Sequence, residues 1–346
     1  MEIKKLTEFS PGAGCGCKIS PKDLESILKS STPFTSNPNL IVGNDTKDDA
    51  AVFDMGNGQA IISTTDFFTP IVDDPYDFGR IAATNAISDV YAMGGKPIMA
   101  LAILAWPLKK LSTVIAQKVI EGARDVCAQA GIVLAGGHSI DIDDPVFGLS
   151  VNGIVNTDNI KQNNTAKPNS TLFLTKPLGI GVATTAEKKK LRTHEENKHV
   201  VNLMATLNKV GAVFGELDYV SSMTDVTGFG LLGHLSEICE GSNVDAVIEY
   251  DAVPKIQGLE RLIEQDCMPG GTTTNWLSYG DKIGTVTDEQ RALLCDPQTS
   301  GGLLVVVDDN HVEEFLTVAK SEGLLLNPIG KLFERTNDKA PYVSVN

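Results

Sequence analysis

The sequence predicts a mixed α+β or α/β fold that is organised as two domains. Helical and strand-like segments alternate along most of the 346 residues, which is typical of sheets covered by helices. A polar stretch at 158–170 (DNIKQNNTAKPNS) separates two alternating halves and is expected to link them. A chain of this length buries roughly three quarters of its unfolded surface, so the fold needs no disulfide framework.

The first half is expected to contain a hairpin, helices and further strands. Strand-like segments at 50–55 and 59–65 are joined by Gly56-Asn57-Gly58, a turn sequence that favours positive φ. Between 77 and 93 apolar residues recur at helical spacing, and Gly94-Gly95 ends the pattern as a C-cap does. The other expected elements are strands at 97–106, 132–135 and 146–155 and a helix at 112–130.

The second half is expected to begin with a strand at 171–175, followed by a glycine turn at 177–181. The remaining expected elements are helices near 184–190, 195–215 and 311–322 and strands near 244–250 and 303–307. Upstream of the hairpin, prolines and glycines surround one short helix at 21–30 that begins on a proline. We therefore divide the chain into a glycine-rich N-terminal segment (1–42), a first domain (43–157), the linker (158–170) and a second domain (171–346).

The charge balance and the apolar runs exclude several classes of protein. Lys and Arg number 29 against 44 Asp and Glu, so the net charge is −15 and broad binding to nucleic acid or anionic membranes is not expected. The longest apolar run, at 97–108, is too short to span a bilayer, and no signal-peptide core is visible in the first 30 residues. We expect a cytoplasmic protein whose six cysteines are thiols.

Aspartates stand at the ends of several predicted elements. Taken singly, each of them is explained by a turn, a helix cap or a solvated surface. Asp89 is different because it lies inside an apolar helix, one turn after Asn85, and a buried carboxylate needs a partner. Carboxylates that converged on one place would repel each other unless a cation lay between them, and Mg²⁺ bound together with substrate phosphates would meet that need. The other candidates are Asp48, Asp49, Asp66 and Asp225.

Three glycine-rich turns follow predicted strands, at 135–139, 179–181 and 228–233. Glycines let backbone N–H groups approach phosphate oxygens, although each of these segments is equally explained as a simple turn. The third one (GFGLLG) matches a dinucleotide fingerprint, but Thr224, Asp225 and Thr227 are polar where a buried strand should end. His138 is the histidine that we would place near a site, and 12–18 is not a Walker A motif because Cys17 replaces its glycine.

Cys15 and Cys17 flank a glycine beside Lys18, in a segment with almost no packing residues. Two cysteines without a second pair are weak support for a metal site. Exposure and an adjacent ammonium lower the pKa of a thiol, so a reactive cysteine is the better interpretation. Cys127 and Cys239 fall at apolar positions of predicted helices, which favours buried and inert thiols.

Eight segments, taken together and in order, resemble the selenophosphate synthetase (selenide, water dikinase) family, within the wider aminoimidazole-ribonucleotide synthetase-like superfamily. The N-terminal GCGCK discriminates this family from the rest of the superfamily. The segments are GAGCGCK (12–18), GNDTKDDAAV (43–52), TTDFF (64–68), ATNAISDVYAMGGKP (83–97), LAGGHSID (134–141), TKPLGIG (175–181), TDVTGFGLLGHL (224–235) and LLCDPQTSGGLL (293–304).

The resemblance implies a two-domain architecture of mixed sheets flanked by helices. It also implies a homodimer with ATP bound partly at the dimer interface, and a reaction of ATP, selenide and water that gives selenophosphate, AMP and orthophosphate and requires Mg²⁺. A selenium-delivery protein is a further expected type of partner. By position, the resemblance makes Cys15 and Lys18 catalytic, assigns Lys18, Thr46, Lys47, Asp48, Asp66, Asp89, Gly137, His138 and Ser139 to ATP, and assigns Asp49, Asp89 and Asp225 to the metal.

Three alternatives stay open at this point. A superfamily relative that phosphorylates an amide, formyl or thiamine-type substrate would release ADP and would not need Cys15. A nucleotide-binding protein without turnover would act in selenium delivery or sensing. A dehydrogenase would use the GFGLLG turn to bind NAD.

Overall fold

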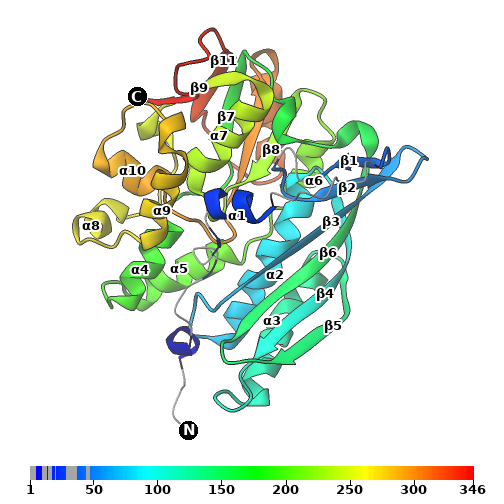
Figure 1. Cartoon of the computed structure of the whole chain (residues 1–346), viewed down its shortest axis with the longest axis vertical. Coiled ribbons are helices and arrows are strands. Elements are labelled where there is room, and N and C mark those ends of the chain that lie inside the picture. Colours follow the sequence, from blue (N-terminus) through cyan, green and yellow to red (C-terminus); the bar gives the residue numbers. More distant parts are fainter. Residues whose placement is uncertain (1–4, 10–13, 15–17, 20, 29–36, 44–46) are drawn as a thin grey trace.

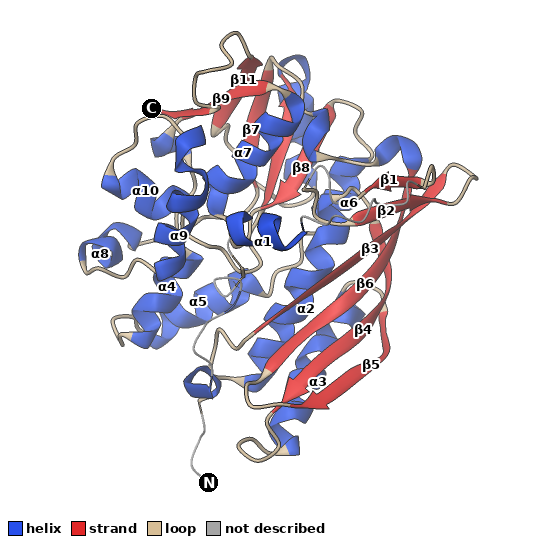
Figure 2. Cartoon of the chain, viewed as in Figure 1, coloured by secondary structure: helices blue, strands red, loops and turns tan. Residues whose placement is uncertain are grey.

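The computed structural model describes residues 5–9, 14, 18–19, 21–28, 37–43 and 47–346 (Figure 1). In this part of the chain the strands form two six-stranded sheets, the first from β1–β6 and the second from β7–β12 (Figure 2). The segment between β6 and β7 carries two short 3-10 turns, Thr157–Asn159 and Asn163–Thr165. The domain boundaries given above stay a prediction.

The first sheet has the order β1-β2-β3-β6-β4-β5 and is antiparallel except for the β4–β5 pair. Along β3 inward and outward side chains alternate, with Ile62 and Thr64 buried and Ile61 and Phe67 exposed. One face of the sheet is therefore covered, by α2 and α3, and the other is open. The strands are β1 (Leu40–Val42), β2 (Ala51–Asp54), β3 (Gln59–Phe68), β4 (Lys96–Trp106), β5 (Val133–Asp141) and β6 (Val146–Asn156).

Helix α2 (Pro75–Ala92) lies between the first sheet and the second half of the chain (Figure 1). Asp74 caps its start by accepting hydrogen bonds from the backbone N–H groups of Tyr76 and Asp77, and Pro75 occupies the first turn. From Phe78 onward nearly every residue of α2 is buried, because the sheet packs on one side and the second half on the other. This double packing carries the polar side chains of α2 into the interior.

The second sheet has the order β12-β9-β11-β7-β10-β8, and its pairs are antiparallel except β9 with β12. Strand β8 lies at an edge and pairs only with β10 among the strands that the structure describes. The strands are β7 (Ser170–Leu174), β8 (Val220–Asp225), β9 (Val244–Ile248), β10 (Leu303–Asp308), β11 (Gly330–Glu334) and β12 (Val343–Val345).

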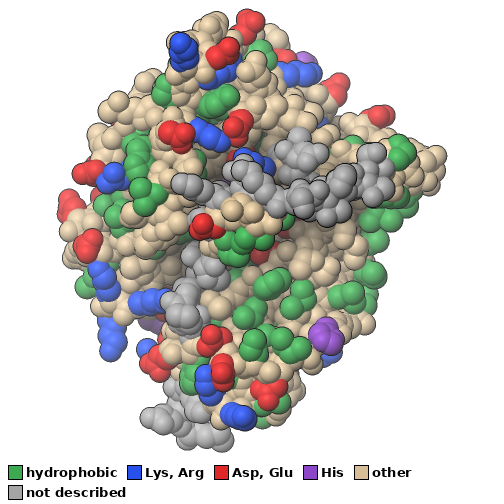
Figure 3. All heavy atoms as spheres, in the orientation of Figure 1, with side chains coloured by type: hydrophobic (Ala, Val, Ile, Leu, Met, Phe, Trp, Pro, Cys, Tyr) green, Lys and Arg blue, Asp and Glu red, His purple; other side chains and the backbone are tan. Residues whose placement is uncertain are grey.

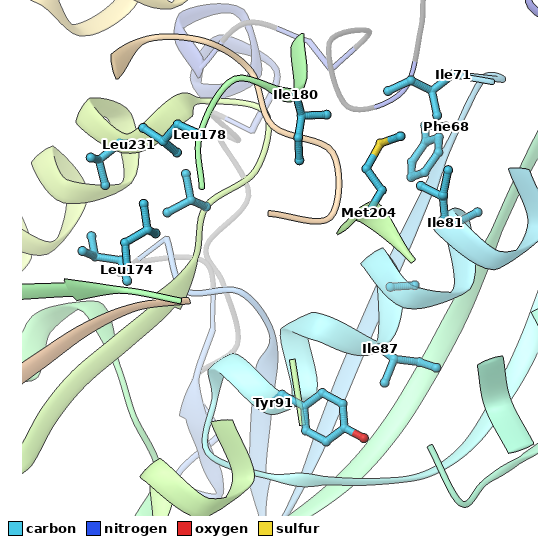
Figure 4. Packing of buried hydrophobic residues seen from close by; sticks show 14 of the residues in the cluster. Phe68, Ile71, Ile81, Ile87, Tyr91, Leu174, Leu178, Ile180, Met204 and Leu231 are labelled. Carbon is cyan, nitrogen blue, oxygen red and sulfur yellow. The ribbon is translucent and has the colours of Figure 1, made fainter. Parts of the chain in front are cut away.

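Helices surround the second sheet, and a shared apolar core joins them to the first half. Met204 of α5 points toward Phe68, Ile71 and Ile81 of the first half (Figure 4), and all four residues are buried. The two halves are therefore packed against each other through apolar side chains. The described helices are α1 (Pro21–Leu28), α3 (Thr113–Gln129), α4 (Ile180–Lys188), α5 (His194–Met204), α6 (Val210–Gly215), α7 (Gly230–Ser242), α8 (Leu259–Glu264), α9 (Gly270–Tyr279), α10 (Asp288–Leu294) and α11 (Val312–Ser321).

The expected helix–strand alternation is confirmed, with several local differences. The helix expected over 195–215 is two helices, α5 and α6, because the chain leaves helical geometry between Ala205 and Lys209 to pack against α2. The strand expected at 132–135 continues to Asp141, because its pairing with β4 resumes at Gly137 after a shift of register between Ala100 and Ala102. Short elements without strong periodicity (β1, β11, β12, α8, α9 and α10) were not predicted. None of the described helices has the length and apolar character needed to cross a membrane.

Candidate active site

Aspartates from four segments come together between the two sheets. Asp49 precedes β2, Asp66 lies on β3, Asp89 on α2 and Asp225 at the end of β8. We call these four residues the carboxylate cluster. Asp225 lies close enough to Asp49 and to Asp89 for its negative charge to raise the pKa of each. The charge of Asp66 also raises the pKa of Asp89. The fold therefore gathers carboxylates from distant parts of the chain, since Asp49 contacts Thr224, the neighbour of Asp225, across a separation of 175 residues.

Neighbouring hydroxyls form hydrogen bonds with Asp49, Asp89 and Asp225, the three inner carboxylates of the cluster. Thr224 Oγ1 donates to Asp49 Oδ1 at 2.8 Å, and Thr64 Oγ1 donates to Asp89 Oδ2 at 2.5 Å. The Ser88 hydroxyl hydrogen-bonds to Asp225. Within the described part of the chain, the buried Oδ2 atoms of Asp49 and Asp225 have no hydrogen-bond partner. A buried carboxylate oxygen without a partner is costly, and because these two lie in one cluster of carboxylates, they favour the binding of a group that the protein chain itself does not supply.

Burial and mutual repulsion raise the pKa values of the inner carboxylates. Burial is the largest cause for all three, and it raises the pKa of Asp225 to about 6. The pKa values of Asp49 and Asp89 lie well above the usual range, because burial and the nearby carboxylates both disfavour the charged form. Without a cation the cluster therefore retains protons that an isolated aspartate would lose.

Lys18 brings a positive charge to the edge of the carboxylate cluster. Its Nζ lies 3.5 Å from Asp66 Oδ2, and its charge lowers the pKa values of Asp89 and Asp225. Asn85 Nδ2 donates to the same Asp66 oxygen at 2.5 Å. The side chain of Lys18 is 38% exposed, so it can meet a ligand that enters from solvent.

Residues 47–49 are attached to the segment between β6 and β7 and to α7. Asn163 donates from its backbone N to Asp48 Oδ1 at 2.6 Å and from Nδ2 to the Lys47 carbonyl at 2.9 Å. Lys47 has a positive φ of 56° and pairs with Glu240 at 3.6 Å. These contacts fix the segment that carries Asp49. Thr46, which was expected to contact ATP, lies outside the described residues.

Gly137, His138 and Ser139 do not join the carboxylate cluster within the described chain. They lie inside β5, at the edge of the first sheet opposite β1, and all three are exposed. At Gly137 a Cβ atom would lie 2.1 Å from the Ala102 carbonyl oxygen, so the glycine allows the close β4–β5 pairing here. The expected turn at 135–139 is therefore an exposed edge strand.

Cys15 and Cys17 lie outside the described residues, and Gly14 beside them is described. The Gly14 N–H donates to the Thr69 carbonyl at 3.1 Å, and its φ is +53°. A Cβ at this position would lie 2.5 Å from Ile71 Cδ1 and 2.6 Å from Thr299 Oγ1. Of the free thiols in the described part, Cys127 and Cys239 are buried as expected, and burial raises the thiol pKa of Cys127 to about 11.

The two other glycine turns are explained by the fold. The N–H groups of Gly179 and Ile180 donate to Gln298 Oε1, and that of Gly181 donates to Asp296 Oδ2. The chain therefore satisfies the donors that we considered for phosphate. The GFGLLG turn follows β8, an antiparallel edge strand, so the parallel strand–helix–strand unit that a dinucleotide fingerprint requires is not formed there.

Sequence reasoning missed two polar groups near the carboxylate cluster. Lys176 is buried, its charge lowers the pKa of Asp225, and burial lowers its own pKa to about 7. On α7, His234 Nδ1 lies 3.5 Å from Glu237 Oε2, and burial raises the pKa of Glu237 to about 7. A lysine inside the motif TKPLGIG and the i, i+3 spacing of the His–Glu pair were the available signals.

The carboxylate cluster fits a hard divalent cation such as Mg²⁺. Carboxylate oxygens are the ligands that this ion prefers, and two of them lack a partner here. No group of three or more His, Cys, Asp or Glu side chains in the described ranges is arranged to hold a metal ion by itself. Mg²⁺ usually keeps several waters and binds through one or two carboxylates together with substrate phosphates, so it does not require a cage of three protein ligands.

The domain families that the chain matches agree with this architecture. Residues 47–155 match the AIR synthase related protein, N-terminal domain, and residues 167–342 match the AIR synthase related protein, C-terminal domain. Among solved structures, a thiamine-monophosphate kinase from Stenotrophomonas maltophilia covers 90% of this chain and 92% of its own, with a TM-score of 0.67 and 19% identity. The hydrogenase maturation protein HypE in complex with ATP covers 86% and 82%, with a TM-score of 0.63 and 18% identity. These likenesses show a shared fold.

Sequence relatives are much more similar. A selenide, water dikinase of Photorhabdus laumondii is 60% identical over 342 residues, which are 99% of this chain and 98% of the relative. A selenide, water dikinase of Pasteurella multocida is 57% identical over 341 residues, with coverage of 99% and 97%. The expected resemblance is confirmed over nearly the whole length of the chain. The chain belongs to the selenide, water dikinase family.

Proposed function

We propose that the chain forms selenophosphate from ATP, selenide and water at the carboxylate cluster, with release of AMP and orthophosphate. The observation that carries this proposal is the convergence of Asp49, Asp89 and Asp225 from three distant segments, with two carboxylate oxygens left unpaired. Such a cluster suits the binding of a triphosphate through a divalent cation. The identity of the substrates is inferred from membership of the selenide, water dikinase family.

Asp49, Asp89 and Asp225 are the residues that would hold Mg²⁺. When bound, the ion would neutralise the phosphate oxygens and orient the triphosphate. The protein's own contribution is to hold the three carboxylates in place and to offset part of the cost that burial imposes on their charged form. The hydroxyls of Thr224, Thr64 and Ser88 do this by donating to one oxygen of each, which favours the charged form.

Lys18 supplies a positive charge beside the carboxylate cluster, in addition to that of the metal ion. Its ammonium, partly exposed and 3.5 Å from Asp66, lies where it can pair with a phosphate that enters the site. Phosphoryl transfer depends mainly on positioning and charge neutralisation, so a lysine placed beside the carboxylates acts on the transition state. We assign Asp66, Lys47, Asp48 and Thr46 to nucleotide contacts.

We assign selenide handling to Cys15, on the basis of its motif. Its neighbour Gly14 packs between Ile71 of the first half and Thr299 of the second, a contact that leaves no room for a side chain. Lys18, three residues after Cys15, reaches the carboxylate cluster. Gly14 and Lys18, the described positions on either side of Cys15 in the sequence, thus both have contacts with the folded chain.

We propose that the open face of the first sheet forms a homodimer interface. Large apolar side chains gather over this face (Figure 3), and among them Phe67 is 51% exposed and Val133 is 64% exposed. A contiguous apolar patch on a soluble protein is typical of a protein–protein interface. The other members are Phe53, Ile61, Ile98, Met99 and Leu101.

The edge strand β5 borders that face, which supports a role for Gly137, His138 and Ser139 in the site of the second copy. These residues are exposed, and within the described chain they lie three strands away from Asp66 on β3. We also propose a cytoplasmic location, because the four described cysteines are free thiols, and delivery of selenium by a partner protein.

Product analysis tests the proposal. The purified protein is incubated anaerobically with ATP and Mg²⁺, with and without selenide, and the nucleotides are separated by chromatography. Selenide-dependent AMP is the expected product. ADP as the stable product would indicate a superfamily relative with another acceptor, and an absence of turnover would indicate a binding protein; either result would refute the proposal.

A further inference from the structure

A line of hydrogen bonds connects the interior of the second half to Lys18. It begins at Lys176, which is only 5% exposed and follows β7. Its Nζ donates to the Thr206 carbonyl at 2.7 Å and to the Ser300 carbonyl at 2.9 Å. Both the charged and the neutral amine can donate these two hydrogen bonds, so the contact does not depend on the protonation state of Lys176.

Ser300 carries the connection across to α2. This residue is fully buried and has a positive φ of 55°, in the turn that precedes β10. Its N–H donates to Asn85 Oδ1 at 2.8 Å, and Asn85 Nδ2 donates to Asp66 Oδ2 at 2.5 Å. The same Asp66 oxygen is the one that faces Lys18 Nζ at 3.5 Å.

The geometry of Asn85 makes this connection directional. Its amide oxygen accepts from the second half and its amide nitrogen donates to the first sheet, so a flipped amide would break both contacts. Asn85 is fully buried, and Lys18 is partly exposed. The line thus begins at buried residues of the second half, and it ends at Lys18, whose side chain is partly exposed to solvent.

We propose that Asn85 and Lys176 are positioning residues for the reaction, which hold Asp66 Oδ2 where it fixes the Lys18 ammonium beside the carboxylate cluster. The inference rests on the role of Lys18 and Asp66 proposed above. Neither Asn85 nor Lys176 contacts a reacting group in this scheme. Their loss therefore acts on kcat, through Lys18, more than on the KM for ATP.

Lys161 offers a matched control for Lys176. It is also 5% exposed, and its Nζ donates to two backbone carbonyls, those of Leu217 at 3.0 Å and Val220 at 2.7 Å. Val220 begins β8 and Asp225 ends it, so Lys161 serves the opposite end of the same strand. A lysine with the same burial and the same kind of contacts is therefore available outside the line to Lys18.

The experiment compares Lys176→Met, Lys161→Met and Asn85→Ala, and the doubles Asn85→Ala/Lys176→Met and Asn85→Ala/Lys161→Met. Thermal unfolding, kcat and the KM for ATP are measured with Mg²⁺ and selenide. We expect Lys176→Met and Asn85→Ala each to lower kcat by about tenfold or more, with the KM for ATP changed by less than about threefold. Lys161→Met is expected to lower the unfolding temperature with kcat unchanged.

The double variants test whether the two residues act in one line. Asn85→Ala/Lys176→Met should lose little more kcat than the worse single variant, because Lys176 reaches Asp66 only through Ser300 and Asn85, so its loss adds little once Asn85 is gone. Equal loss of kcat in Lys161→Met, or additive losses in Asn85→Ala/Lys176→Met, would overturn the inference. If Lys176→Met does not fold, Asn85→Asp carries the test, since it keeps an acceptor for Ser300 N–H and loses the donor to Asp66; unchanged kcat in that variant would overturn the inference as well.

Lys18→Met separates this inference from the proposed function. An inactive Lys18→Met beside fully active Asn85→Ala and Lys176→Met would reject the positioning line alone. An active Lys18→Met would reject the assigned role of Lys18 and, with it, the line that leads to it.

Discussion

The Thr224 hydroxyl donates a 2.8 Å hydrogen bond to Oδ1 of Asp49, a residue 175 positions earlier in the chain. Thr224 is the neighbour of Asp225 on β8, so one contact joins carboxylates that arrive from different halves of the protein. Hydrogen bonds to charged groups contribute about 1.5–3 kcal/mol. The relative position of Asp49 and Asp225 therefore depends on a side chain that is not itself a candidate metal ligand.

Replacing Thr224 by Val should weaken metal binding. The substitution keeps the shape of the fully buried side chain and removes the donor to Asp49. We expect the affinity for Mn²⁺, measured by electron paramagnetic resonance, to fall by about tenfold, which is about 1.4 kcal/mol. Thr171→Val is the matched control, because Thr171 Oγ1 donates to Asp309 at 2.5 Å on the same sheet, outside the carboxylate cluster. Equal loss of affinity in both variants would contradict the prediction.

Removing a charge from the cluster should abolish metal-dependent turnover. Asp225→Asn and Asp49→Asn each delete a carboxylate oxygen that lacks a partner in the described chain. We expect turnover to fall by about a hundredfold or more and Mn²⁺ binding to weaken in parallel. Asp296→Asn is the control, since Asp296 is a fully buried carboxylate that accepts the N–H of Gly181 at the start of α4. That variant should change the unfolding temperature and leave Mn²⁺ binding intact; weakened binding there would argue against the assignment.

The metal-free protein should show the raised pKa of Asp89 in its stability. The unfolded chain releases this proton near a pKa of 3.8, whereas burial and Asp225 raise the native pKa well above it. The contribution of Asp89 to stability is thus complete at low pH and is lost as pH rises through the native pKa. Asp89→Asn has no such loss, so we expect the unfolding temperature of the variant to rise relative to that of wild type as the pH increases from 3.8 toward neutral.

Mg²⁺ with ATP should reverse that order at the higher pH, because it binds the ionised wild-type cluster. Asp143→Asn, at a carboxylate that is 94% exposed, provides the control and should follow wild type throughout. A constant difference between Asp89→Asn and wild type across this pH range would contradict the raised pKa.

Introducing a charged side chain on the open face of the first sheet should dissociate the proposed homodimer. Phe67 is 51% exposed on the outward side of β3. We expect Phe67→Glu to convert a dimer into a monomer in light scattering and to lower turnover. Leu277→Glu is the control, since Leu277 is 78% exposed on α9, away from this face. A wild-type protein that is monomeric at micromolar concentration would refute the proposal.

Cys15→Ser should separate nucleotide binding from selenium chemistry. The variant keeps Lys18 and the carboxylate cluster, so we expect ATP affinity to change by less than about threefold while selenophosphate formation is lost. Calorimetry and product analysis measure the two quantities. Unchanged turnover would show that the Cys15 thiol is not required.

Local patterns revealed much of the candidate site before the fold was known. Asp89 stood out because a carboxylate inside an apolar helix needs a partner, and α2 does prove to be buried on both sides. Lys176 did not stand out, because its acceptors Thr206 and Ser300 lie 30 and 124 residues further along the chain. Contacts of that range leave no local periodicity.

The glycine turns also show that local sequence does not reveal long-range contacts. Gly179 and Gly181 have the composition of a phosphate loop, yet their N–H groups donate to Gln298 and Asp296, more than a hundred residues later. The break between α5 and α6 was missed because its sequence contains no strong helix breaker before Asn208. Tertiary packing decided both features.

Anaerobic phosphorus NMR of the protein with ATP, Mg²⁺ and selenide tests the central claim most directly, with Asp225→Asn and a selenide-free sample in parallel. The account predicts a new selenide-dependent phosphorus resonance in the wild type, with AMP and orthophosphate growing beside it, and none of these signals in Asp225→Asn. A wild-type spectrum in which ADP accumulates without the new resonance, or an Asp225→Asn spectrum that matches wild type, would contradict it.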